Sequence, residues 1–212
     1  MVNAAASISY PPSQALSDLV QISPIVAVAV ALIVALLADL VLPPARRGST
    51  AAAIAVVGLL AALLLAFVRW LQGGGQSAYY GFATGDNLAL FFEMLFSVLG
   101  ILTVAVSHAY MRRRNFLEAE FHVLTLAALV GMMALAAATS LVTVFLALET
   151  FSLALYVSCG FARQDTTSQE AAAKYLLIGG FASAFVLYGM ALVYGASGST
   201  LLPEIARAVT SQ

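Results

Sequence analysis

Residues 141–194 read LVTVFLALETFSLALYVSCGFARQDTTSQEAAAKYLLIGGFASAFVLYGMALVY, two apolar runs joined by a short polar turn. Glu149 lies near the middle of the first run, and Lys174 lies about two turns into the second. A charge at the centre of a membrane helix costs about 2.5–3.5 kcal/mol on insertion scales, so such residues usually face protein or water and often mark an ion path. The pattern therefore predicts two membrane helices that carry part of an ion path.

The composition defines the fold class. The chain has 212 residues, of which 62% are hydrophobic and 9% are charged, whereas a soluble domain averages about 25% charged residues. Several apolar runs approach the length that crosses a bilayer as a helix. The sequence predicts an all-α polytopic membrane protein whose surroundings are the lipid bilayer. The net charge of −1 argues against a nucleic-acid partner.

Six transmembrane helices are expected, with boundaries set by prolines, glycines and charges. Residues 1–18 read as a short polar tail, and residues 196–212 as a second tail with a short interfacial helix after Pro203. The spans group into a first set within 19–120 and a second set within 121–195. They cover about 19–42, 50–68, 87–107, 121–138, 141–162 and 168–195.

Basic residues predict the orientation of the chain. The connections after the first, third and fifth spans are rich in arginine, whereas those after the second and fourth spans, with the C-terminal tail, hold only Arg69 and Arg207. By the positive-inside rule the arginine-rich connections are cytoplasmic, and both termini face outward. The arginines concerned are Arg46, Arg47, Arg112, Arg113, Arg114 and Arg163.

Glu149 is the leading candidate for a site. With its helix ending near Arg163, it would lie roughly 21 Å along the helix, deep in a core about 30 Å thick. Ser152, Tyr156 and Gly160 follow at helical spacing and make a polar-to-small stripe. The alternative is a protonated glutamic acid that only hydrogen-bonds a neighbouring helix. An ionisable group at this depth favours the functional interpretation.

Lys174 has a specific structural alternative. Thr167 and Glu170 fit a capping box that would start its helix. Glu170 also lies four residues before Lys174, in the orientation that suits a surface ion pair, and lysine side chains snorkel to the interface. Glu149 and Lys174 differ by about 10 Å in expected depth, so we expect no direct contact and another cation closer to Glu149.

Four further ionisable residues are weaker candidates. Asp39, at the end of the first span, suits an exposed interfacial carboxylate, and Glu93 lies about two turns into the third helix. His108 and His122 flank the basic connection; their titration range suits a proton relay, although histidines at a membrane edge are more often solvated. The sequence contains no nucleophile–base pair, phosphate loop or metal-ligand cluster, so we expect no catalysis by side chains of this chain.

The strings FLALETFSLALYVSCGF (145–161) and SQEAAAKYLLIGGFASAFVLYGMALVYGASGST (168–200) resemble the N-type antiporter-like subunits of bacterial NADH–quinone oxidoreductase, respiratory complex I. The resemblance implies a subunit that moves protons across the inner membrane while other subunits bind NADH, flavin, iron–sulfur clusters and quinone. The family's motif glutamate falls on Glu149 and its sixth-helix lysine on Lys174. In the family that glutamate pairs with a lysine on a broken seventh helix.

The chain also differs from the family that it resembles in its number of helices. Family members have about fourteen helices, including two inverted repeats, whereas this chain shows six. We therefore expect a fragment, a truncated reading frame or one piece of a split subunit. Two other hypotheses remain: a subunit of a multi-subunit sodium/proton antiporter, and a structural scaffold whose charges only join helices.

Overall fold

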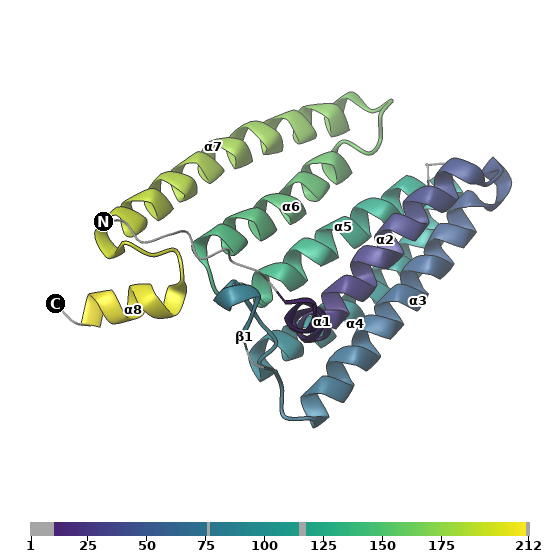
Figure 1. The fold of residues 1–212 in the computed structure, drawn as a ribbon. Helices are drawn as coiled ribbons and strands as arrows, with labels where there is room; N and C mark the ends of the chain where they lie inside the picture. The colour runs from purple at the N-terminus through teal and green to yellow at the C-terminus, as the bar shows by residue number, and fades with distance from the viewer. Residues whose placement is uncertain (1–10, 76, 115–117, 211–212) are drawn as a thin grey trace.

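The structure, a computed structural model, describes residues 11–75, 77–114 and 118–210. Six of its helices are long and apolar enough to cross a membrane, which confirms the all-α polytopic fold class. Successive helices run in alternating directions along the bundle (Figure 1). The six are α2 (Ser23–Val41), α3 (Pro44–Leu71), α4 (Asn87–Arg114), α5 (Glu118–Ala136), α6 (Leu141–Cys159) and α7 (Thr166–Ser197).

Two short helices lie at one end of this bundle. The expected N-terminal tail is helical over α1 (Pro12–Gln21), which begins at a proline because proline suits the first turn of a helix. Ile22 departs from helical geometry and separates α1 from α2, so the first expected span is divided there. The expected C-terminal helix is α8 (Leu202–Thr210), which is amphipathic.

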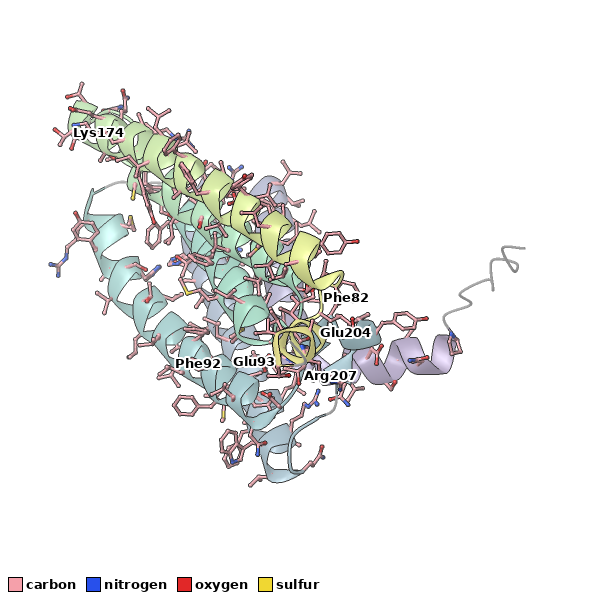
Figure 2. All side chains as sticks on the ribbon, turned by 90° about the vertical axis from the view of Figure 1, so that its left-hand side faces the viewer. Phe82, Phe92, Glu93, Lys174, Glu204 and Arg207 are labelled. Carbon is pink, nitrogen blue, oxygen red and sulfur yellow. The ribbon has the colours of Figure 1, made fainter. Side chains whose placement is uncertain are left out.

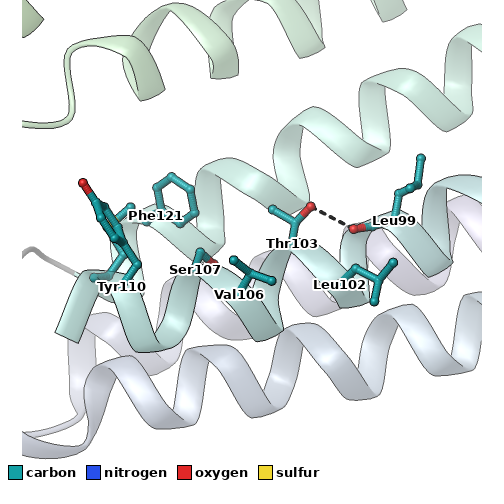
Figure 3. A pocket seen from close by; sticks show the side chains of 8 residues that line it. Leu99, Leu102, Thr103, Val106, Ser107, Tyr110 and Phe121 are labelled. Carbon is teal, nitrogen blue, oxygen red and sulfur yellow. Dashed lines mark hydrogen bonds between the residues drawn. The ribbon is translucent and has the colours of Figure 1, made fainter. Parts of the chain in front are cut away.

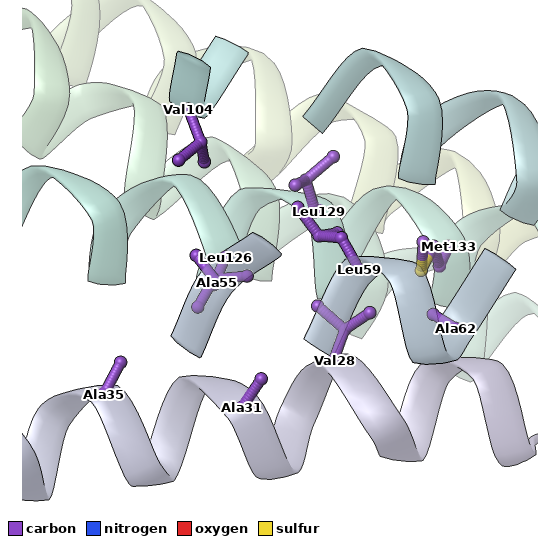
Figure 4. Close-up of a cluster of buried hydrophobic side chains, with 10 residues drawn as sticks. All are labelled: Val28, Ala31, Ala35, Ala55, Leu59, Ala62, Val104, Leu126, Leu129 and Met133. Carbon is purple, nitrogen blue, oxygen red and sulfur yellow. The ribbon is translucent and has the colours of Figure 1, made fainter. Parts of the chain in front are cut away.

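Small residues let the helices of the core approach one another closely. A Cβ atom on Gly58 of α3 would lie 2.2 Å from Ala31 Cβ of α2, so these two helices nearly touch. The buried cluster joins α2, α3, α4 and α5 (Figure 4). Its members are Val28, Ala31, Ala35, Ala55, Leu59, Ala62, Val104, Leu126, Leu129 and Met133.

α6 and α7 extend this core to one side. α6 packs on α5, and α7 packs mainly on α6 at the edge of the bundle (Figure 1). No residue of α7 is buried within the described chain, although large apolar side chains cover it. The face of α7 turned away from α6 is therefore apolar and exposed.

The two ends of the bundle differ in chemistry. At one end, named here the basic end, lie Arg46, Arg113 and Arg163. At the other end, the hairpin end, β1 (Ser77–Ala78), η1 (Tyr79–Gly81) and β2 (Ala83–Thr84) form a small turn-rich hairpin. Backbone hydrogen bonds join this hairpin to the α5–α6 turn, where Thr84 N donates to Ala137 O at 2.8 Å. The same turn pairs with Leu201, so three connections are held together there.

Candidate ion-pathway site

Glu149 lies near the middle of α6. Ser140 caps this helix by accepting a hydrogen bond from Thr143 N at 3.1 Å, and the helix ends at Cys159. Glu149 is thus ten residues from the basic end of its helix, about 15 Å along the axis and close to the middle of a bilayer core. The side chain is half-buried, and its Oε1 is buried without a hydrogen-bond partner among the described residues. Such an oxygen is costly in a structural role and is therefore a candidate for function.

The predicted polar stripe of α6 faces α7. A Cβ atom on Gly179 of α7 would lie 2.0 Å from the Tyr156 hydroxyl, and one on Gly160 would lie 2.9 Å from Ala172 Cβ. Tyr156 and Ser152 are both buried. Because Glu149 shares this face by helical spacing, the stripe predicted from the sequence lies along the α6–α7 contact.

The backbone of α6 packs closely against α5 beside Glu149. A Cβ atom on Gly131 of α5 would lie 2.6 Å from Phe151 N and 3.0 Å from Ala147 O. These two atoms belong to residues on either side of Glu149 in the chain. The middle of α6 is therefore fixed against α5 at the depth of the carboxyl group.

Lys174 pairs with Glu170, as its structural alternative expected. Its Nζ lies 2.5 Å from Glu170 Oε1, and the lysine side chain is 67% exposed. The contacts between α6 and α7 place Lys174 opposite the end of α6 near Cys159, ten residues and about 15 Å from the level of Glu149. The rings of Tyr156 and Tyr175 lie between these levels, with centroids 4.7 Å apart. Glu149 and Lys174 are therefore not brought into direct contact.

The start of α7 differs from the predicted capping box. The helix begins at Thr166, and the Asp165 carboxylate accepts a hydrogen bond from Thr167 N at 2.9 Å. Ser168 Oγ instead donates to Cys159 O at 2.7 Å across the α6–α7 connection. Asp165 rather than Thr167 is thus the cap of this helix.

A second carboxylate is more deeply buried than Glu149. Glu93 of α4 is 1% exposed, and its Oε2 has no partner among the described residues. The buried Arg69 of α3 attracts it electrostatically and donates to Val20 O and to Gln21 Oε1 at the α1–α2 junction. Glu93 and Lys174 lie toward opposite ends of the bundle (Figure 2).

From the sequence, Arg69 was counted only among the basic residues of a connection, and its attraction to Glu93 was not predicted. In the loop that follows Arg69, a Cβ atom on Gly75 or Gly85 would meet both Gln21 and the Arg69 guanidinium. Glycine at these two positions therefore leaves room for the Arg69 and Gln21 side chains.

The structure also brings the two histidines together, at the basic end. Their rings are stacked with centroids 6.0 Å apart. His122 is fully buried, and neither of its ring nitrogens has a partner among the described residues. The expectation of solvated histidines is thus wrong for His122, because α5 packs inside the bundle from its first turn, while His108 is half-buried.

The last candidate residue is Asp39, and the last kind of site to consider is a metal site. Asp39 is half-buried rather than exposed as expected, and its Oδ1 lies 3.9 Å from Arg47 Nε. Within residues 11–75, 77–114 and 118–210, no three His, Cys, Asp or Glu side chains gather as metal ligands would.

Six membrane-length helices with buried carboxylates between them define the class: a polytopic helical membrane protein with ionisable groups in its interior. Residues 138–212 match the family described as NADH:quinone oxidoreductase/Mrp antiporter, TM. This match includes Glu149, Lys174 and the stripe between α6 and α7.

Curated relatives agree with this family. The chain is 40% identical over 176 residues to NADH-quinone oxidoreductase subunit N of Trichlorobacter lovleyi, covering 83% of this chain and 36% of the relative. It is 37% identical over 199 residues to subunit N of Chloroflexus aggregans, covering 94% of this chain and 40% of the relative. The chain thus spans well under half the length of these relatives.

Solved structures agree as well. A chain of respiratory complex I from Thermus thermophilus, with bound aureothin, matches with a TM-score of 0.70 and 31% identity, over 88% of this chain and 41% of that one. A chain of the archaeal membrane-bound sulfane sulfur reductase shares the fold, with a TM-score of 0.71 and 19% identity, over 91% and 39%. The predicted resemblance is confirmed: the chain is similar to the antiporter-like membrane subunits and aligns with part of the N type.

Proposed function

We propose that the chain forms the N-terminal portion of a proton-translocating membrane subunit of an NADH–quinone oxidoreductase. Glu149 is the group that takes up and passes on protons. The observation that carries the proposal is a carboxyl group in the middle of a membrane helix with a buried, unpartnered oxygen, inside the segment that matches the antiporter family.

The arrangement of α6 and α7 suggests how protons reach Glu149. Lys174 lies toward the basic end, and Tyr156 lies on the same contact between the levels of lysine and glutamate. Protons enter from the basic end and move along this contact. Lys174 acts on Glu149 through intervening water, because about 15 Å separates their levels.

The rest of the reaction belongs to other chains. NADH, flavin, iron–sulfur clusters and quinone are bound by other subunits, and other membrane subunits of complex I are the partners of this chain. We place the chain in a bacterial inner membrane, with the basic end in the cytoplasm and both termini outward.

The experiment measures the proton-to-electron ratio of the assembled complex carrying Glu149→Gln or Lys174→Ala. Both variants should lower the ratio or the turnover, whereas Glu204→Gln on the exposed α8 should leave both unchanged. Normal pumping by both the Glu149 and Lys174 variants would refute the proposal.

The two other hypotheses give different results in the same experiments. A sodium/proton antiporter subunit would show sodium-dependent transport in vesicles; the family description also names an antiporter, the Mrp antiporter. A scaffold would lose assembly with Glu149→Gln but keep full activity in each complex that assembles.

A further inference from the structure

An apolar groove runs along the outside of α4 and α5 toward the basic end. Two adjoining cavities, of about 500 and 330 Å³, share Leu99, Thr103 and Phe121 in their walls. The part nearer the basic end is also lined by Leu102, Val106 and Tyr110 (Figure 3). The groove is therefore continuous over several turns of α4.

The chemistry of the groove suits a hydrocarbon chain. Its walls are almost entirely apolar, and the hydroxyl of Thr103 is already satisfied because it donates to Leu99 O at 2.8 Å. Its long axis follows a membrane helix, as an acyl chain in a bilayer does. A polar small molecule would find few hydrogen-bond partners here.

The basic end of the groove carries an excess of positive charge. The groove ends at Tyr110 and Met111, and the last three residues of α4 are arginines, of which Arg113 is exposed. The nearest acidic side chain among the described residues on α5, Glu120, is neutralised by Arg163, whose Nη2 lies 2.6 Å from Glu120 Oε2. The α4–α5 and α6–α7 connections at this end hold four arginines (112–114 and 163) against Glu118, Glu120 and Asp165, which leaves one positive charge.

We propose that this groove binds one phospholipid with an anionic headgroup. One acyl chain lies along α4 between Leu99 and Tyr110, and the phosphate lies at the basic end of the groove, where α4 ends in three consecutive arginines. Basic sites at the cytoplasmic ends of membrane helices attract anionic lipids, and each arginine removed should reduce the preference about fivefold. The inference is independent of proton transfer at Glu149.

The experiment uses fluorescence of the full chain in phosphatidylcholine vesicles. Trp70 is the only tryptophan, so Trp70→Phe with Val106→Trp places a single reporter in the groove. Val106 lies eight residues before Arg114, about 12 Å along the helix, which is the depth of mid-chain bromine atoms on a bound lipid. Brominated phosphatidylglycerol should quench it more than brominated phosphatidylcholine at the same mole fraction.

Two controls keep the result decisive. Changing the three arginines 112–114 to glutamine should abolish the excess quenching, whereas Arg46→Gln at the same end should not. High salt should reduce the excess in the unmodified arginine background, which tests the proposal even if the triple variant folds poorly. Equal quenching by the two lipids, or an excess that survives both charge removal and salt, would overturn the proposal. Protection from both lipids, as by another protein helix, would overturn it as well.

Discussion

Glu149 and Glu93 are both acidic side chains inside the helical bundle, but only one has a cation that attracts it. Glu93 lies beside the buried Arg69, which also holds the α1–α2 junction by two hydrogen bonds. No ion pair joins Glu149 to a cation within the described part of the chain. The two carboxyl groups therefore differ in their electrostatic surroundings, although each has one buried oxygen without a partner among the described residues.

The Arg69–Glu93 pair makes a prediction about stability. Arg69→Ala should destabilise the fold by about 1.5–3 kcal/mol, because it removes the charged donor to Val20 O and Gln21 Oε1 and the cation that attracts Glu93. Glu93→Gln should cost less, and adding it to Arg69→Ala should recover part of the loss. Unfolding in mixed detergent micelles, followed by helical circular dichroism, measures each value. Strictly additive losses in the double variant would contradict a coupled pair.

Gly131 makes a second prediction at this scale. Gly131→Ala should destabilise the fold by roughly 1–3 kcal/mol, because the new methyl group would meet backbone atoms of α6 that cannot move aside. Gly180→Ala is the matched control, since nothing lies within 4 Å of its Cβ position. It should be neutral or stabilising by up to about 1 kcal/mol, because alanine favours helix. Equal effects of the two changes would disprove the close contact of α5 and α6.

At the scale of the elements, local hydropathy predicted the helices and turns, because these do not depend on which helices pack together. All six long helices were predicted, as were the tight α5–α6 turn and the C-terminal helix, because apolar length and turn residues are local signals. The break at Ile22, the buried Arg69 and the buried His122 were not predicted, because each depends on which helix lies opposite. The polar stripe of α6 was predicted from residue spacing, but only the structure shows that α7 packs against it.

The N-terminal cap of α7 makes a prediction about local helix stability. Asp165→Ala should cost about 1 kcal/mol and increase amide hydrogen exchange in the first turn of α7, since its carboxylate caps Thr167 N. Thr167→Ala should have a smaller effect, because the Thr167 side chain is not the cap. The opposite order of effects would restore the capping box predicted from the sequence.

At the scale of the whole molecule, the two ends of the bundle differ in how they are closed and charged. The hairpin end is closed by backbone hydrogen bonds between three connections, while the basic end carries arginines and the buried histidine. Glu149 lies between these ends on the contact of α6 and α7. Proton translocation through Glu149 requires that its carboxyl group exchange protons with water inside the protein.

Infrared spectroscopy of the purified chain tests this requirement most directly. The difference between the unmodified chain and Glu149→Gln isolates the signals of this one carboxyl group, and Glu204→Gln shows that the difference is specific. We predict that the Glu149 signals interconvert between acid and carboxylate forms with pH, and that the acid carbonyl band shifts promptly in D₂O. A Glu149 band that changes neither with pH nor in D₂O would contradict the account.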